Sequence, residues 1–574
     1  MTKIMSIHRS ILLFLLFPIS TVLLAAEADI ILHHARIYTV DSDQSWAEAI
    51  AIKNGRISFV GSDQDVKSHQ GKNTQLVDMK GKFILPSFQD VHIHPVAGGV
   101  AKTTGCPIFD MGGLKLILEK IARCVKDDSD SLHISGYGWS WDDFSEDNPP
   151  HKAMLDKIDS SRPLFFGDSD GHTLILNTAA LAFAGITADT PDPEGGMIGR
   201  DPKTGELTGL LMEDSGMNLL LSKMPKITSN ELKQGLLMAQ SYLHSLGITA
   251  IQDAIVQVNA HNAFASLPVY KDMADSGELE LRVVAALYWD PSKGMSQVAE
   301  LQAARKQYSA GRLQATSVKF WADGILESYT AKMLEPYTDS PDSFGLLMVP
   351  HKQLLSATTI MDKLGFQLHI HAIGTATVRY ALDAIEAAQI ANGKRDARHH
   401  IAHVQLVHPD DIPRFGSLDV TANFQPFWAY GDSYVIDINA PQLGPERMEW
   451  MYPIGSIAKN GGRLAFGSDW SVSTANPFPA MEIAITRQDP ETSTTEVFNP
   501  DERITLKQAI AGYTIGAAYT NFLDDDTGSI EEGKYADLIV VDRNLFEIPV
   551  SEISEANVLV TLLEGKEVFG KLSQ

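Results

Sequence analysis

Hydrophobic positions fall into short, strand-like runs at both ends of the chain. Between residues 29 and 86 turn signals separate these runs, and Asn54-Gly55 lies between the apolar runs 49–52 and 57–60, as in a two-residue β-hairpin. Runs of the same kind return within 523–574. The pattern predicts one small β domain that both ends of the chain build together.

The middle of the chain, 87–522, alternates apolar runs with amphipathic stretches such as 229–246 and 375–392. Repeated alternation of this kind predicts an α/β fold with a parallel sheet, and a TIM-like (β/α)8 barrel is the simplest closed solution. Residues 105–240 are too long for one barrel loop, so we expect an insertion over the barrel mouth. The strand-like runs are 164–166, 249–251, 282–287, 317–320, 367–371, 398–404, 420–424 and 463–466.

The first 28 residues predict an export signal peptide. Lys3 and Arg9 form a basic start, the run 11–24 carries no charge, and Ala26-Glu27-Ala28 has the small residues of a cleavage site. The uncharged run is short for a membrane span. We therefore expect cleavage after Ala28, no stable membrane span in the mature protein, and a periplasmic or secreted location. An uncleaved anchor is the alternative.

Composition and charge narrow the function classes. Of the 574 residues, 44% are hydrophobic and 21% are charged, which is the balance of a folded globular protein. The formal net charge of −25 disfavours non-specific binding to nucleic acid or anionic membranes. We expect a small-molecule substrate as the partner.

The chain has two cysteines, Cys106 and Cys124. In an exported protein they are expected to pair as a disulfide, and two buried thiols are the alternative. Two cysteines are too few for a zinc site built from cysteine alone.

Histidines recur at the ends of the apolar runs in the barrel region. His92 and His94 alternate along one predicted strand and so face the same side, where two imidazoles can fill two positions of a metal shell. His371 and His403 each end a later run, and Asp469 follows another. A carboxylate there can bind a metal and accept a proton from water. Each residue alone has a structural explanation, but five in matching positions predict a catalytic metal site.

Lys319 lies in the apolar run 317–320. A lysine at a strand end can be solvated or ion-paired, which is the structural interpretation. If its side chain points into the barrel, a bare ammonium beside a metal cation is costly. Burial lowers the pKa of lysine and favours the free amine, which carbon dioxide can convert to an anionic, bridging carbamate.

Six stretches of the chain together resemble the amidohydrolase superfamily. The match is closest to its third family, the YtcJ-like branch that includes N-substituted formamide deformylases, and it spans essentially the whole mature chain. The stretches are LPSFQDVHIH at 85–94, VKFWADG at 318–324, HIHAIG at 369–374, RHHIAHVQLV at 398–407, AFGSDW at 465–470 and GSIEEGKYADL at 528–538.

The resemblance implies a TIM-like barrel with a β-sandwich domain formed from both chain ends. It implies zinc as the metal, with one or two ions per chain, and a homodimer is typical of such barrels. The residues that it assigns are His92, His94, His371, His403 and Asp469 as metal ligands, Lys319 as a carbamate bridge, and Asp469 also as the general base.

Several residues near the predicted ligands are candidates for contact with the substrate. His172 lies in a stretch that resembles a site-lining segment of the family, where it can act in catalysis by donating a hydrogen bond to a carbonyl or oxyanion. A surface histidine beside a helix cap is the alternative. Trp139 can form an aromatic wall or lie in the core. Asp323 can contact the substrate or a ligand, and Glu213 is a weaker candidate.

Positions close to His371 modify this interpretation. His369 shares a strand face with His371, so it is a reserve ligand. Thr375 and Ala402 stand where the family often has Asp and Glu. Thr375 therefore removes a carboxylate near His371, which can alter how the ligand is oriented.

We expect an exported metal-dependent hydrolase that cleaves a carbon–nitrogen bond other than a peptide bond, in an amide or cyclic amide. Zinc lowers the pKa of bound water and polarises the carbonyl, while Asp469 takes the proton and returns it to the leaving nitrogen. An esterase or lactonase needs the same site. A non-catalytic periplasmic binding or regulatory protein can also keep this fold, but a binding module needs no general base.

Overall fold

The computed structural model describes residues 27–109, 111–145, 148–169, 171–258, 265–492 and 496–573. The predicted signal peptide, residues 1–28, lies outside the described residues except for Glu27 and Ala28. Within the described ranges, no helix is long and apolar enough to cross a membrane.

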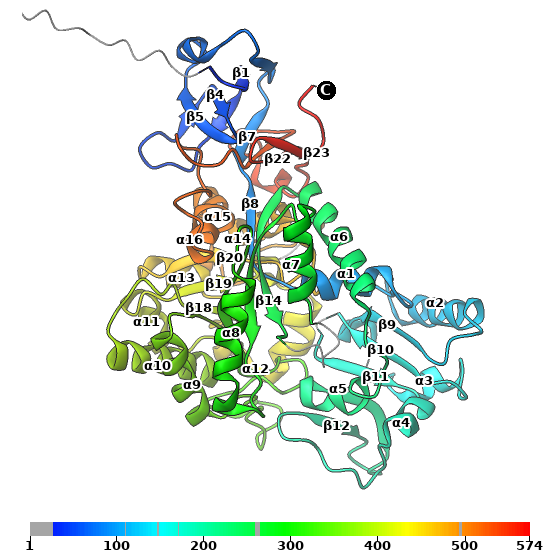
Figure 1. The fold of residues 1–574 in the computed structure, drawn as a ribbon. Coiled ribbons are helices and arrows are strands. Elements are labelled where there is room, and N and C mark those ends of the chain that lie inside the picture. The colour runs from blue at the N-terminus through cyan, green and yellow to red at the C-terminus, as the bar shows by residue number, and fades with distance from the viewer. Residues whose placement is uncertain are drawn as a thin grey trace, which may run out of the picture.

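Eight parallel strands form a nearly closed barrel at the centre of the molecule (Figure 1). The order runs from β20 through β19, β18, β17, β16, β15 and β14 to β8. The predicted TIM-like barrel is confirmed. Its strands are β8 (Phe88–Ile93), β14 (Ile248–Val256), β15 (Arg282–Tyr288), β16 (Leu313–Trp321), β17 (Gln367–Ala372), β18 (His400–His403), β19 (Thr421–Phe424) and β20 (Arg463–Phe466).

Polar contacts bring the first and last strands of the barrel together. The Asp90 carboxylate accepts the backbone N–H of Ser468 at 3.1 Å and that of His92 at 3.0 Å. The Asp469 N–H donates to the His92 carbonyl at 2.7 Å. Gly467 permits this approach, because a Cβ there would lie 2.6 Å from the His92 nitrogen. Closure of the barrel thus sets the end of β8 beside the residues that follow β20.

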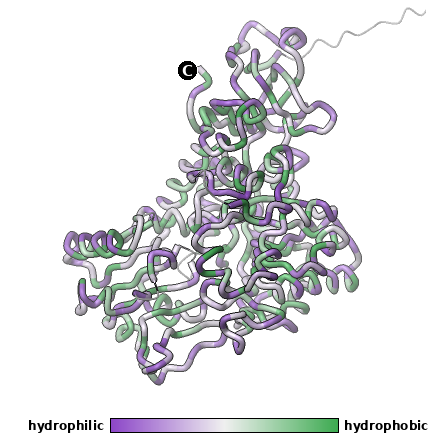
Figure 2. The backbone as a smooth tube through the Cα atoms, turned by 180° about the vertical axis from the view of Figure 1, so that it is seen from behind, coloured by the Kyte–Doolittle hydropathy of each residue, from purple (hydrophilic) through white to green (hydrophobic). Residues whose placement is uncertain are grey.

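Helices cover the outside of the barrel and bury its apolar strands in one large core. The predicted stretch 229–246 forms α6 (Ser229–Ser245), which starts at a capping box between Thr228 and Glu231. The other predicted stretch forms α10 (Thr375–Asn392). Hydrophilic segments lie mainly on the outer helices and loops (Figure 2). The remaining helices around the barrel are α1 (Pro95–Thr103), α7 (Leu267–Ser276), α8 (Val298–Tyr308), α9 (His351–Lys363), α11 (Ile412–Ser417), α12 (Ala440–Met448), α13 (Ile454–Lys459), α14 (Pro477–Thr486), α15 (Leu506–Tyr513) and α16 (Ile515–Thr520).

An inserted layer between α1 and α6 carries its own five-stranded sheet. The run 164–166 falls within the predicted insertion, 105–240, and forms β10 in the inner part of the inserted sheet. Phe165 and Phe166 pack into apolar clusters on opposite faces of that sheet, which explains the continuous apolar run. Cys106 and Cys124 of this layer form a disulfide. The elements are α2 (Leu114–Asp127), β9 (Ile134–Trp139), α3 (Lys152–Asp156), β10 (Leu164–Asp168), β11 (Thr173–Leu176), α4 (Thr178–Ala184), β12 (Met197–Arg200), β13 (Leu207–Met212) and α5 (Glu213–Leu221).

Strands from both ends of the chain pair in one six-stranded sheet. β7 pairs antiparallel with β21, and Ile84 lies opposite Val540. A four-stranded sheet contributes side chains to the same apolar cluster. Asn54 and Gly55 have φ values of 51° and 77°, as the predicted hairpin turn requires. The strands are β2 (Arg36–Tyr38), β3 (Trp46–Ala47), β7 (Phe83–Pro86), β21 (Leu538–Val541), β22 (Val558–Leu563) and β23 (Lys566–Phe569), then β1 (Ile30–His33), β4 (Ala49–Lys53), β5 (Arg56–Gly61) and β6 (Gln75–Asp78).

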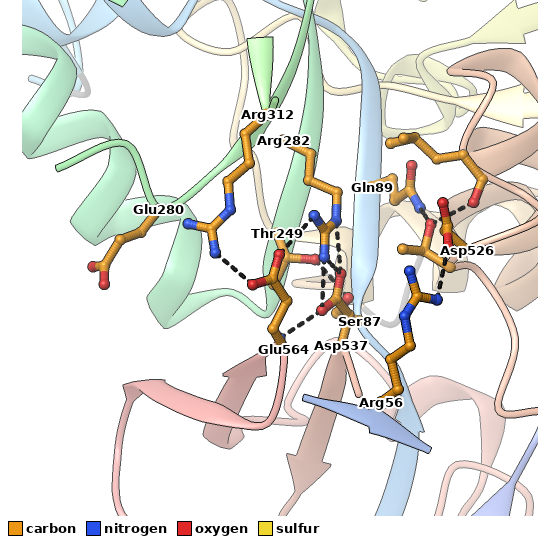
Figure 3. Close-up of polar contacts among 12 residues, drawn as sticks. Arg56, Ser87, Gln89, Thr249, Glu280, Arg282, Arg312, Asp526, Asp537 and Glu564 are labelled. Carbon is orange, nitrogen blue, oxygen red and sulfur yellow. Dashed lines mark hydrogen bonds and ion pairs between the residues drawn. The ribbon is translucent and has the colours of Figure 1, made fainter. Parts of the chain in front are cut away.

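Ion pairs join these terminal strands to the barrel, and the pair between Arg282 and Asp537 is buried (Figure 3). Arg282, at the start of β15, lies 3.0 Å from Asp537 and 3.0 Å from Glu564. Arg312 lies 2.9 Å from Glu564. Burial raises the pKa of Asp537, and the positive charge of Arg282 opposes that rise. The carboxylate of Asp537 therefore depends on Arg282 for its charge compensation.

Replacing Arg282 with methionine is expected to lower the free energy of unfolding by about 3–5 kcal/mol, because Asp537 then stays buried without its partner. Urea unfolding measures the loss. The control is Arg36→Met, since the side chains of Arg36 and its partner Glu547 are each 58% exposed. For that control we expect a change below about 1 kcal/mol. Equal losses in the two variants would contradict the role assigned to the Arg282 pair.

Candidate metal centre

The side chains of the predicted site meet at one end of the barrel. They lie at or just beyond the carboxyl ends of their strands, where barrel enzymes place their catalytic groups. His92 belongs to β8, Lys319 to β16, His371 to β17 and His403 to β18, while His94 follows β8 and Asp469 follows β20.

The carboxylate of Asp469 lies among three imidazoles. Its Oδ1 is 3.0 Å from His94 Nε2 and 3.4 Å from His92 Nε2. Its Oδ2 is 3.9 Å from His403 Nδ1. One ligand atom from each of His92, His403 and Asp469 lies within 4.8 Å of the other two. These three side chains converge as the ligands of one metal ion do.

Lys319 and His371 lie beside this group. The Nζ atom of Lys319 is 3.4 Å from His92 Nε2, and the ring centroids of His371 and His403 are 4.4 Å apart. Both side chains are almost fully buried. The barrel therefore brings together all six of the residues predicted as ligands.

Burial keeps the imidazoles neutral. It lowers the pKa of His92, His371 and His403 well below the usual value. The charge of Lys319 lowers the pKa of all three further. A neutral imidazole is the form of histidine that binds a metal.

Asp469 and Lys319 respond to burial in different ways. Burial alone would raise the pKa of Asp469, but the hydrogen bond from His94 and the electrostatic interactions with His94, His403 and Lys319 bring it well below its usual range. Burial lowers the pKa of Lys319 to about 7, although Asp469 and Asp253 favour its charged form. At neutral pH the site thus holds the Asp469 carboxylate beside the neutral imidazoles of His92, His371 and His403.

The donor atoms of the site fit a divalent cation. Both ring nitrogens of His403 are buried without a hydrogen-bond partner among the described residues. Buried polar atoms without partners are rare because each costs free energy. A cation held by His92, His403 and Asp469 supplies the missing interaction, and His94, His371 and Lys319 are close enough to complete the shell.

Backbone strain gathers at the same strand ends. His403, Val404 and Asp469 have φ values of 75°, 49° and 55°. This left-handed region is uncommon for residues other than glycine, and most of all for a β-branched valine. Strain of this kind clusters at functional sites, where the surrounding structure fixes the side chains in place.

A model described as the amidohydrolase family matches residues 75–569 of the chain. The chain belongs to the amidohydrolase family. The resemblance read from the sequence motifs is therefore confirmed. The predicted enzyme class is confirmed with it: a metal-dependent hydrolase that acts on carbon–nitrogen bonds other than peptide bonds.

Similar proteins cover nearly the full length of this amidohydrolase. Protein LONG AFTER FAR-RED 3 of Arabidopsis thaliana is 32% identical over 94% of this chain and 92% of that protein. N-substituted formamide deformylase of Arthrobacter pascens is 25% identical over 94% of this chain and 97% of its own. An uncharacterized metal-dependent hydrolase from Pyrococcus furiosus superposes with a TM-score of 0.67 at 24% identity, covering 90% and 99% of the two chains. The last likeness shows the shared fold.

Asp323 lies behind a ligand of the amidohydrolase site, so its prediction as a substrate contact is wrong. It is 0% exposed, and its Oδ1 is 3.2 Å from His371 Nδ1. The carboxylate also accepts the backbone N–H groups of Lys332, Ile373 and Gly374. Asp323 therefore fixes the orientation of His371, which corresponds to the alternative of a contact with a ligand.

His369 also lies behind a ligand. Its Nε2 is 2.8 Å from His92 Nδ1, and its ring centroid is 4.1 Å from that of His400. It supports His92 from deeper in the barrel. The structure gives it no place beside Asp469 as a reserve ligand.

The inserted layer places the other two candidates differently. Trp139 is 1% exposed in the core of that layer, and its indole N–H donates to the Phe166 carbonyl at 2.9 Å. The prediction of an aromatic wall at Trp139 is therefore wrong. His172 does reach the site, because its ring centroid lies 5.7 Å from that of His371 and 4.8 Å from that of Trp321.

Sequence reasoning missed Trp428. Its ring stacks on His403 with centroids 5.7 Å apart and an interplanar angle of 9°. The signal that could have found it is its place in the short helix Pro426–Trp428, just beyond the end of β19, since the other site residues also follow barrel strands.

Proposed function

We propose that this protein is an exported, zinc-dependent amidohydrolase that cleaves the carbon–nitrogen bond of a small amide or cyclic amide. The observation that carries the proposal is the Asp469 carboxylate, which lies within 4 Å of His92, His94 and His403. Histidines around one carboxylate favour zinc, and the carboxylate is placed to move protons.

The proposed reaction uses Asp469 and His172. A divalent ion held by His92, His403 and Asp469 would polarise the scissile carbonyl and lower the pKa of bound water. Asp469, a carboxylate at neutral pH because its pKa is lowered, accepts the proton that the attacking water loses. It then donates this proton to the leaving nitrogen. His172 donates a hydrogen bond to the carbonyl oxygen as negative charge grows there.

Lys319 is carboxylated in this proposal. Its pKa of about 7 makes the amine largely neutral above that pH. The neutral amine combines with carbon dioxide to give a carbamate and one proton. A carbamate at this position suits two zinc ions, whereas an unmodified lysine suits one.

The proposal also includes a β-sandwich domain built from both ends of the chain and export of the protein. The four-stranded and six-stranded sheets share one apolar cluster, which supports a sandwich built from both ends of the chain. Residues 1–28 support export to the periplasm followed by cleavage after Ala28. A homodimer is proposed on the pattern of such barrels, and sedimentation of the mature protein tests it.

Metal analysis of protein recovered from the periplasm without a chelator is the decisive experiment. We expect an amino terminus at Asp29 and one or two equivalents of zinc. The double variant His92→Ala/His94→Ala should lose the metal, since it removes two ligands on one strand. His151→Ala, a change in the inserted layer at the start of α3, is the matched control and should keep it. A folded protein that holds no metal and rejects added zinc would overturn the proposal.

A substrate panel then tests the bond that is cleaved. N-substituted formamides come first, because the Arthrobacter relative is named for deformylation of these compounds. Cyclic amides, esters and lactones follow. Turnover confined to esters or lactones would favour the esterase alternative. A zinc-loaded protein without turnover on any of them would favour a binding protein.

A further inference from the structure

We infer that Glu213, a carboxylate supplied by the inserted layer, is the positioning residue of His172. The inference rests on the proposed function, because it assigns His172 a partner in the same reaction. Glu213 opens α5, directly after β13, and it is 0% exposed. A carboxylate buried to this degree needs specific partners.

The first partner of Glu213 is His172 itself. The Oε2 atom of Glu213 is 2.8 Å from His172 Nδ1. The backbone N–H of Glu213 donates to the His172 carbonyl at 2.7 Å, and the His172 N–H donates to Asp168 Oδ1 at 3.0 Å. Side-chain and backbone contacts thus fix one residue against the other.

The second partner comes from the barrel. The hydroxyl of Thr330 donates to the Oε1 atom of Glu213 at 2.5 Å. Gly324, between β16 and Thr330, leaves room for this contact, because a Cβ there would lie 2.2 Å from Glu213 Oε1. Both carboxylate oxygens are therefore engaged, one by the inserted layer and one by the barrel.

The backbone of Glu213 is also strained. Its φ of 63° lies in the left-handed region, which a glutamate rarely adopts. A buried carboxylate on a strained backbone is unfavourable for folding alone. Such a combination persists where the surroundings hold it in place for a function.

The pairing decides which ring nitrogen of His172 meets the substrate. Because Nδ1 is engaged by Glu213, Nε2 is the nitrogen that can reach a reacting group beside His371. A carboxylate on Nδ1 fixes the rotation of the ring, so that Nε2 is held toward the reacting group beside His371. Without this contact the ring loses its orientation.

A double-mutant cycle tests the inference on zinc-loaded enzyme with the substrate that the panel identifies. Glu213→Gln keeps the size of the side chain and removes its charge. We expect kcat to fall by about 10–100-fold, with KM and zinc content nearly unchanged. In the His172→Ala background the same change should cost nothing further, because Glu213 acts through His172. Independent, multiplicative losses would overturn the inference.

The matched control is Glu482→Gln. Glu482 lies in α14 and is 3% exposed, and its carboxylate accepts the Ser554 N–H at 2.8 Å. It should leave kcat unchanged. If Glu213→Gln does not fold, Gly324→Ala replaces it. The added methyl group would displace Glu213 at its contact with Thr330.

A crystal structure of the zinc-loaded Glu213→Gln variant separates this inference from the proposed function. Absence of turnover in the wild type on every amide, ester and lactone would overturn the proposed function alone. The orientation of the His172 ring then decides the inference. A ring displaced from its place beside His371 supports the positioning role, and an unchanged ring overturns it.

Discussion

Asp469→Asn is expected to lower kcat by about 10²–10⁴-fold without loss of the fold, which is the contribution of a positioned general base. Asparagine keeps the shape of the side chain and an oxygen that can face the metal, but it cannot accept the proton of the attacking water. In the wild type, the hydrogen bond from His94 and the electrostatic interactions with His94, His403 and Lys319 keep Asp469 ionised. Steady-state kinetics at saturating substrate measure the loss, with zinc content determined on the same samples.

Asp411→Asn is the control for this change. Asp411 is 2% exposed and pairs with Arg379 and Arg414 outside the site. This variant should lose stability and keep kcat. An Asp469→Asn enzyme with full zinc and nearly wild-type kcat would exclude Asp469 as the general base.

The ligands were predictable because the position along a strand fixes where a side chain lies in a barrel. His92 and His94 alternate on β8, and Asp469 follows β20. Alternation shows which face a residue occupies, but it does not show depth. His369 and His371 share a face of β17, yet His369 lies deeper and contacts His400. The interior of a barrel is filled in layers of side chains. Only the three-dimensional structure therefore shows whether a histidine binds the metal or supports a ligand from the layer below.

The sequence predicts the insertion at 105–240 but not the sheet inside it, for a related reason. A continuous apolar run shows that both faces of a strand are buried, but it does not show which sheet covers them. The run 164–166 and the buried Trp139 therefore gave no sign of a second sheet. Glu213 is 41 positions away from His172 in sequence. Their contact depends on how β11 and β13 pair, which no local pattern encodes.

Lys319→Met is expected to stabilise the metal-free protein while it disables the enzyme. The pKa of Lys319 is lowered from 10.5 to about 7 by burial. Between these pH values the unfolded chain holds a proton that the folded chain has lost, so the free energy of unfolding of the wild type rises with pH across this window. Methionine has no ammonium to bury. We expect Lys319→Met to raise the free energy of unfolding by about 1–4 kcal/mol at pH 7. Urea unfolding should show that this difference from the wild type shrinks as the pH approaches 10.5.

The same substitution is expected to lower activity, although it raises stability. Without the amine no carbamate forms, so Lys319→Met should bind at most one zinc ion and lose most of its turnover. In the wild type, isotopically labelled bicarbonate should give a carbamate signal by nuclear magnetic resonance that is absent from the variant. Lys332→Met is the control, because Lys332 is only partly buried and its ammonium group donates to the Gly345 carbonyl. A variant at Lys319 that keeps two zinc ions and full turnover would show that this lysine serves the fold alone. A gain in stability paired with a loss of zinc would instead show that the protein keeps a destabilising group in its core because the metal site requires it.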